Sequence, residues 1–202
     1  MKRLRKVLVI AGLGVAVLTG WACSMDPFIV NEAPRPEGWP DLTPIDEVEV
    51  KQYPAYRAAQ VTAGDTSQAS DSAMFSPLFN HIKREDIAMT APVAMTYEGD
   101  KPKSMAFLYR STEQGSTGTD DADPRVAVQD VPGQLMASLG VRGRYTQARF
   151  DEAVQTLNAW LAERDEQWRA VGEPRYLGYN SPFIFGFLRY GEVQVPVEPV
   201  NP

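Results

Sequence analysis

The sequence has one cysteine, Cys23, and one histidine, His81, among its 202 residues. One cysteine cannot form an internal disulfide bond, and these two residues are too few for a Cys/His metal cluster. The sequence also lacks a Gly-x-Ser-x-Gly motif, a His-Glu-x-x-His motif and a phosphate-binding loop. Glu192 and Tyr179 are candidates for acid–base chemistry, but no motif pairs them, and catalysis needs positioned groups. We therefore expect a protein that is not an enzyme.

Positive charge is scarce beyond the first 22 residues. Those residues carry four basic side chains and no acid, so the remaining chain has 16 basic residues against 26 acidic ones. An acidic body repels phosphate backbones, and we expect no nucleic-acid partner. Apolar residues make up 44% of the chain and charged residues 23%, which is typical of a globular domain.

The N-terminal segment, residues 1–22, has the pattern of a targeting sequence. Basic residues precede an apolar run from Val7 to Leu18, which predicts a signal peptide or a membrane anchor. Cys23 follows, and it is a candidate for lipidation because Ala22 suits a bacterial lipobox, although Gly20 does not. Lipidation, an uncleaved anchor and simple cleavage all remain open. Each places the body in the cell envelope, facing the periplasm, and the first two attach it to the membrane.

Three further segments follow along the chain. Residues 23–45 are rich in proline and acidic residues and predict a stiff, extended spacer. Residues 46–197 form the expected domain, and residues 198–202 are a tail.

The domain contains a doubled unit. The stretches Val48–Pro54 and Val126–Pro132 are similar and lie 78 residues apart, and each predicts a β-hairpin with the residues that follow its proline. Apolar periodicity then predicts one helix over residues 70–84 and another over 146–170. Two strands close each half, so the sequence predicts two β-β-α-β-β-like repeats and an α+β fold.

Four short runs carry a resemblance to a known family. They are Asp86-Ile-Ala-Met-Thr-Ala-Pro-Val93, Tyr53-Pro-Ala-Tyr56, the helix core Phe75–Ile82, and Gly178-Tyr-Asn-Ser-Pro182 followed by Arg189-Tyr-Gly-Glu-Val193. In order and spacing they resemble the SOUL haem-binding family over residues 46–197. The resemblance implies a distorted antiparallel β-barrel made of two repeats, with two helices packed on it. It also implies non-covalent haem or tetrapyrrole binding in an apolar cleft beside the first helix.

Apolar and aromatic side chains near that helix are the candidate ligand contacts, because large flat ligands are held mainly by such contacts. Methionine adapts to irregular ligands and can bind haem iron. Core packing is the alternative role for each. For residues 183–187 a buried strand is the favoured alternative, with an apolar ligand site or a membrane contact also open. The predicted ligand-binding residues are Met74, Phe75, Phe79, Met89, Met95, Phe183 and Phe185.

His81 is a candidate axial ligand of haem iron. On a regular helix it points away from Phe75 and Phe79, so a solvent-facing or capping role is the alternative. The resemblance also has gaps, because haem-binding members carry basic residues where this chain has Ser72 and Asn80. Lys83, Arg84 and Arg189 could replace them as partners of the haem carboxylates.

These observations predict a monomeric, non-catalytic binder of haem, a related tetrapyrrole or another apolar amphiphile in the cell envelope. A structural or interaction lipoprotein without a specific ligand is the alternative from a second class. A small-molecule hydrolase of the same superfamily is a third.

Overall fold

The computed structural model describes residues 32–64, 70–99 and 101–200. The predicted targeting segment and Cys23 lie outside the described residues. No helix within the described ranges is long and apolar enough to cross a membrane.

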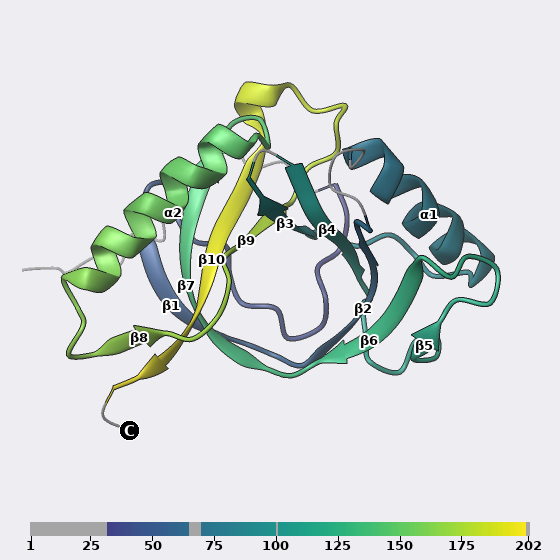
Figure 1. The fold of residues 1–202 in the computed structure, drawn as a ribbon, viewed down its shortest axis with the longest axis horizontal. Helices are drawn as coiled ribbons and strands as arrows, with labels where there is room; N and C mark the ends of the chain where they lie inside the picture. The colour runs from purple at the N-terminus through teal and green to yellow at the C-terminus, as the bar shows by residue number, and fades with distance from the viewer. Residues whose placement is uncertain (1–31, 65–69, 100, 201–202) are drawn as a thin grey trace, which may run out of the picture.

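The described residues form two helices and ten strands in one antiparallel sheet (Figure 1). The helices are α1 (Asp71–Arg84) and α2 (Gln147–Ala162). The strands are β1 (Val48–Tyr53), β2 (Tyr56–Thr62), β3 (Val93–Glu98), β4 (Lys101–Leu108), β5 (Gly118–Thr119), β6 (Val126–Val131), β7 (Gln134–Arg142), β8 (Trp168–Ala170), β9 (Arg175–Gly178) and β10 (Tyr190–Pro199). The predicted α+β class is confirmed.

The sheet is curled but does not close into the expected barrel. Its strand order is β1-β7-β10-β9-β3-β4-β2-β6-β5, with β8 paired to the end of β10, so β1 and β5 are its two edges. Residues 33–45 lie between the two arms of the curled sheet and pack on both of them (Figure 1).

The doubled unit is present, but its strands pair across the two halves. Val48 of β1 pairs with Leu139 of β7, and Val126 of β6 pairs with Val61 of β2. Val48 and Val126 are 78 residues apart, and Val61 and Leu139 are also 78 residues apart. The sequence offset therefore appears as a two-fold symmetric register. The predicted hairpins are wrong, because the first strand of each half pairs with the second strand of the other half.

Both helices begin at a capping side chain. The Ser70 Oγ accepts a hydrogen bond from Ala73 N at 3.2 Å, and Thr146 caps α2 in the same way. α1 contains Pro77 in its interior. α2 ends at Ala162, short of the predicted residue 170, because Trp168–Ala170 instead form β8 against β10.

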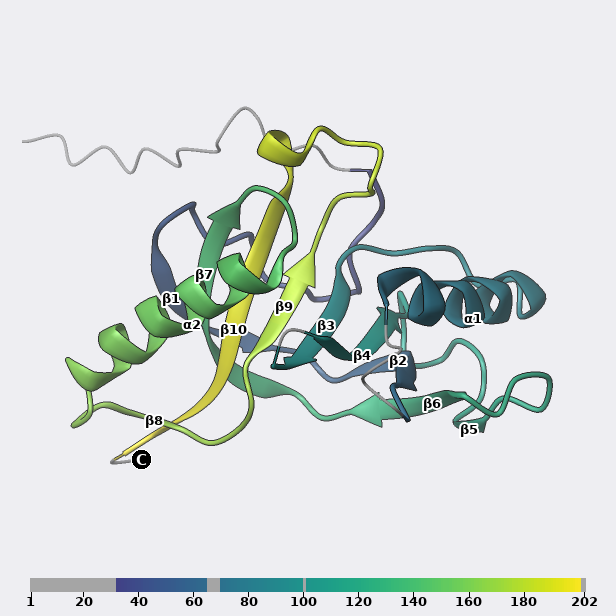
Figure 2. The same cartoon turned by 45° about the horizontal axis from the view of Figure 1, so that its top comes forward.

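The sheet has two differently covered faces, since successive side chains of a strand point to opposite sides. On one face, Ala59 and Val61 of β2 and Val193 of β10 contribute to a core covered by α1 and α2. Figure 2 shows the helices at opposite ends of this layer, α2 beside β7 and β10, and α1 beside β2 and β4. The opposite face packs against residues 33–45, so that part of the predicted spacer belongs to the folded body.

Candidate functional site

An aromatic pair lies on the outer side of α1. Phe75 and Phe79 are one helical turn apart, and their rings stack with centroids 5.8 Å apart. Phe75 is 37% exposed and Phe79 is 44% exposed, although Phe75 also meets the ring of Phe107 of β4 edge-on at 5.0 Å. Lys83 follows at the same spacing and is exposed, so the three side chains form one stripe along the helix. This stripe offers an apolar surface with a positive charge at one end.

The three predicted methionines lie inside or against the core beneath this helix. Met74 is 2% exposed and Met95 is 5% exposed, and both belong to the cluster covered by the helices. Met89 is half-buried and packs against the same cluster. Their burial fits the core-packing alternative, and a ligand on the α1 surface would reach Phe75 and Phe79 before it reached them.

His81 is buried rather than solvent-facing. Its Nδ1 contacts the Asp120 carboxylate, and its Nε2 lies 2.7 Å from the Tyr109 hydroxyl. Arg84 also binds Asp120. An axial role for His81 would therefore require one ring nitrogen to leave its present partner.

The charge of Asp120 is stabilised at this position. Burial alone would raise its pKa, but hydrogen bonds from His81 and from two backbone N–H groups, together with the charge of Arg84, lower the pKa to about 2. The carboxylate fixes the loop that precedes β6 to the end of α1, which is a structural role.

The run 183–187 is an exposed loop, so the favoured prediction of a buried strand is wrong. Phe183 is 93% exposed, and Phe185 and Phe187 are each 71% exposed. The rings of Phe185 and Phe187 stack with centroids 5.9 Å apart. Pro182 and a short 3-10 helix, Gly186–Leu188, keep the backbone out of the sheet. The predicted contacts thus divide into an α1 group and a loop group, and no ring contact joins the two groups among the described residues.

A buried carboxylate on the opposite face of the sheet was not predicted as a site. Glu192 of β10 is 0% exposed and accepts six hydrogen bonds. The donors to Oε1 are Thr43 N (2.8 Å), Tyr190 Oη (2.9 Å) and Lys51 Nζ (3.3 Å), and the donors to Oε2 are Tyr53 Oη, Tyr179 Oη and Gln194 Nε2, each at 3.0 Å. Glu192 and Tyr179 are therefore paired, although no sequence motif indicated it.

Trp39 closes this cluster from the N-terminal segment. Its Nε1 donates to Tyr179 Oη at 3.1 Å, and its ring meets Tyr53 and Tyr56 edge-on at 4.9 and 5.6 Å. Burial alone would raise the pKa of Glu192, but the charge of Lys51 and the hydrogen bonds outweigh it and lower the pKa. The surrounding tyrosines have raised pKa values, first from burial and then from the charge of Glu192, so they remain donors. The cluster holds residues 39–43 on the sheet.

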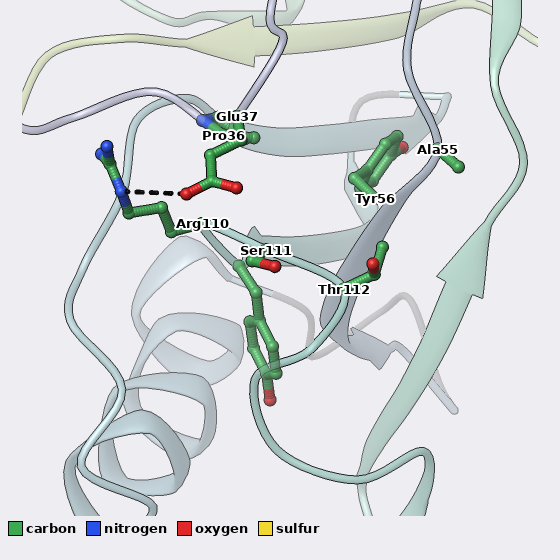
Figure 3. A pocket seen from close by; sticks show the side chains of 8 residues that line it. Pro36, Glu37, Ala55, Tyr56, Arg110, Ser111 and Thr112 are labelled. Carbon is green, nitrogen blue, oxygen red and sulfur yellow. Dashed lines mark ion pairs between the residues drawn. The ribbon is translucent and has the colours of Figure 1, made fainter.

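The surface of the described residues also has hollows, of which two are relevant to ligand size. One of them measures about 180 Å³ and is lined by Tyr56 and Tyr109. Figure 3 shows the ion pair of Glu37 and Arg110, 3.7 Å apart, among its other lining residues. The other, of about 340 Å³, lies between Tyr97 and Phe150 near α2. Ligand pockets usually measure about 300–1,000 Å³, so the first hollow is too small for a tetrapyrrole and the second is at the lower end of the range. The surface of α1 is an open alternative that does not limit the size of a ligand.

Residues 41–196 match the family described as SOUL heme-binding protein. The chain belongs to the SOUL family. The four short runs in the sequence thus indicated the family correctly. The description of the family names haem binding, and α1 of this chain carries the exposed pair Phe75 and Phe79 together with the uncharged Ser72 and Asn80.

Solved structures with a similar fold come from proteins of other descriptions. The C-terminal domain of EcmrR is 15% identical, with a TM-score of 0.52 over 76% of this chain and 98% of that domain. EcmrR in a complex with DNA is 16% identical, with a TM-score of 0.58 over 76% of this chain, which spans 58% of the EcmrR length. A protein described as a hydrolase from Listeria innocua is 13% identical, with a TM-score of 0.55 over 77% of this chain and 94% of that one.

At these identities the likeness shows the fold alone. No curated protein sequence matches this chain.

Proposed function

We propose that this SOUL-family protein binds haem, or a related flat and apolar ligand, without changing it chemically, and that the ligand lies on the α1 surface. The observation that carries the proposal is the stacked, part-exposed pair Phe75 and Phe79. Exposed aromatic surface on a monomer commonly marks a binding site, and a flat ring system can stack on or against such a pair.

Lys83 supplies the polar anchor that an amphiphilic ligand needs. It lies one turn beyond Phe79 on the same side of α1, where its ammonium group can bind a carboxylate. Arg84 and Arg189 were the other candidate anchors, but Arg84 binds Asp120, and Arg189 binds backbone carbonyls of the loop after β9. Both are already engaged within the protein, which favours Lys83.

We also propose that the protein acts as a monomer in the cell envelope, facing the periplasm and attached to the membrane by residues 1–22 or by a lipid on Cys23. The basic start, the apolar run and the small residue before Cys23 support this location. A tethered apolar surface would buffer or relay a ligand that is poorly soluble in water.

Catalysis has little support from the geometry of the paired acid. Glu192 and Tyr179 are buried beneath Trp39 and Thr43. A substrate would reach the carboxylate only after residues 39–43 had left the sheet. We therefore favour binding over hydrolysis.

A haem titration tests the proposal, with the chain from Met25 onward followed by its Soret band. We expect saturable one-to-one binding tighter than about 1 μM, which corresponds to about 8 kcal/mol. Phe79→Ala should weaken binding about tenfold or more, since an aromatic pair contributes about 1 kcal/mol beyond its buried area. Phe187→Ala, the same change on the distant loop, is the matched control and should bind as the wild type does. Weak, non-saturating binding would remove haem as the ligand.

The role of His81 is tested in the same titration. We expect the Soret spectrum of the His81→Ala complex to match that of the wild type, because both ring nitrogens of His81 already have partners. A shifted spectrum from a variant with unchanged circular dichroism would show that His81 ligates the iron.

A further inference from the structure

The loop after β9 presents an unusual apolar surface, which we call the aromatic loop: Phe183, Ile184, Phe185 and Phe187. Three of its rings are more exposed than any other large apolar side chain among the described residues. A soluble protein rarely leaves such side chains clustered in water without a partner.

The aromatic loop is held in shape by polar contacts at its base. Arg189 Nε donates to Ile184 O at 2.9 Å, and Arg189 Nη2 donates to Pro182 O at 2.7 Å. Gly143 N donates to Arg189 O at 2.9 Å, which joins the base of the loop to the segment after β7. The rings are thus presented outward by a fixed backbone.

The start of the described chain is attached to the same loop. Glu32 accepts hydrogen bonds from Ser181 N at 2.6 Å and from Ser181 Oγ at 2.7 Å. Burial alone would raise the pKa of Glu32, but these bonds lower it, so the carboxylate is charged at neutral pH. Cys23 is nine residues before Glu32, and nine extended residues span about 30 Å at most. A membrane attached through a lipid on Cys23 therefore lies within that reach of Glu32, which is bound to the residue two before Phe183.

Basic side chains outnumber acidic ones around the loop, unlike in the rest of the body, although Glu32 is bound to Ser181. Residues 140–150 contain Arg142, Arg144 and Arg149 and no acid, Arg189 lies at the base of the loop, and residues 178–191 contain no acid. The exposed Arg144 side chain lies beside Gly186 within the loop. Aromatic rings flanked by cationic side chains are typical of proteins that lie on a lipid surface, where rings enter the acyl boundary and cations meet phosphates.

We propose that the aromatic loop docks into a lipid bilayer with anionic headgroups, on the side of the body from which the chain leads to its membrane attachment. This inference rests on the proposed membrane attachment and assigns Phe183 and Phe185 to lipid rather than to the haem site. Docking would fix the orientation of the body, with the end of β10 that carries Val197 turned away from the bilayer.

The test places a tryptophan in the loop of the full chain, purified and reconstituted into vesicles that contain phosphatidylglycerol and brominated lipids. The emission of the introduced tryptophan is the difference between the Phe185→Trp and wild-type spectra. We expect this emission to be shifted to shorter wavelength and to be mostly quenched by the brominated lipids. Val171→Trp is the matched control, because Val171 is 50% exposed and hydrogen-bonds to Pro196 at the far end of β10. Its added emission should remain unquenched.

The outcomes separate the two proposals. A Phe185→Trp chain that floats with the vesicles while the emission of its introduced tryptophan stays unquenched overturns loop docking and leaves the attachment standing. A chain that does not float with the vesicles overturns both the attachment and the docking.

Charge-reversal variants test the role of the basic residues around the loop. In the Phe185→Trp background, Arg144→Glu should reduce lipid quenching of the introduced tryptophan, and Arg169→Glu on β8 should leave that quenching unchanged. Equal quenching in both charge variants would overturn the role of the basic surroundings.

Discussion

Replacing Glu192 with glutamine should destabilise the fold more than most single substitutions. The carboxylate is fully buried, it accepts six hydrogen bonds, and the side chain of its charged partner Lys51 is only 12% exposed. Removing one member of a buried ion pair typically costs about 3–5 kcal/mol, because the other charge is left without compensation. The new amide would also place donors against the hydroxyls of Tyr53 and Tyr179. We expect Glu192→Gln to lower the free energy of unfolding by about 3–5 kcal/mol.

A double-mutant cycle isolates the part of this loss that comes from the pair. Lys51→Met should also destabilise the protein, and the double variant should lose less than the sum of the single losses, by about 1–3 kcal/mol. Urea unfolding of the chain from Met25, followed by tryptophan fluorescence at pH 7, measures each value. The matched control is the exposed pair of Arg169 and Glu198, whose side chains are 68% and 44% exposed and whose cycle should give less than about 1 kcal/mol.

The direction of the pKa shift of Glu192 predicts how the stability loss of Glu192→Gln changes with pH. The pKa of Glu192 is lowered in the folded protein, so its stabilisation is present above the unfolded value of about 4.3. The stabilisation is lost as the pH falls through the folded pKa. The difference between the wild type and Glu192→Gln should therefore shrink in acid. A loss below about 1 kcal/mol at pH 7, with no coupling to Lys51, would refute the reasoning that this carboxylate is a charged centre of the fold.

Two further substitutions test the structural contacts of the chain. Asp120→Asn should lower stability by about 2 kcal/mol at neutral pH, since the pKa of Asp120 falls from 3.8 to about 2 on folding and each unit corresponds to about 1.4 kcal/mol. Urea unfolding between pH 7 and pH 2 should show that this loss vanishes as the pH falls from about 4 towards 2. A loss that is independent of pH would contradict the ionic explanation. Gly140→Ala should lower stability by about 2 kcal/mol or more, because the added Cβ would overlap the backbone carbonyls of Thr43 and Pro44; thermal unfolding followed by circular dichroism measures it, with Gly64→Ala, where the Cβ meets nothing within 4 Å, as the control that should change little.

The elements that depend on local sequence could be predicted. Apolar spacing located both helices, and the 78-residue offset revealed two halves. These signals depend on neighbours in the chain. The end of α2 was missed because Trp168–Ala170 gain their backbone partners from β10, which is distant in sequence.

The features that depend on distant contacts could not be predicted. The Pro turn after Tyr53 looks like a hairpin turn, and only the register shows that β1 pairs with β7 rather than β2. The run of phenylalanines at 183–187 is apolar enough for a buried strand, and nothing in its composition reveals that it faces solvent. Pro182 and Gly186 were the local signals against a strand.

The environment of His81 and the cluster around Glu192 also depend on residues that are distant in the sequence. The partners of His81 are 28 and 39 residues away, and Thr43 is 149 residues from Glu192. The quoted runs contained Tyr53, Tyr179, Tyr190 and Glu192 of this cluster, but spacing alone could not bring them together.

The exchange of first strands between the halves has a consequence for how the chain folds. Neither half can complete its own part of the sheet, because β1 needs β7 and β6 needs β2. The β1–β7 pairs join residues 81 to 91 positions apart, from Tyr53–Gln134 to Val48–Leu139. Non-local pairing of this kind slows folding, since the entropy of closing a long loop is lost before the contacts form. We therefore expect the two halves to fold together in one cooperative step. During synthesis, β1 cannot pair until β7 has left the ribosome.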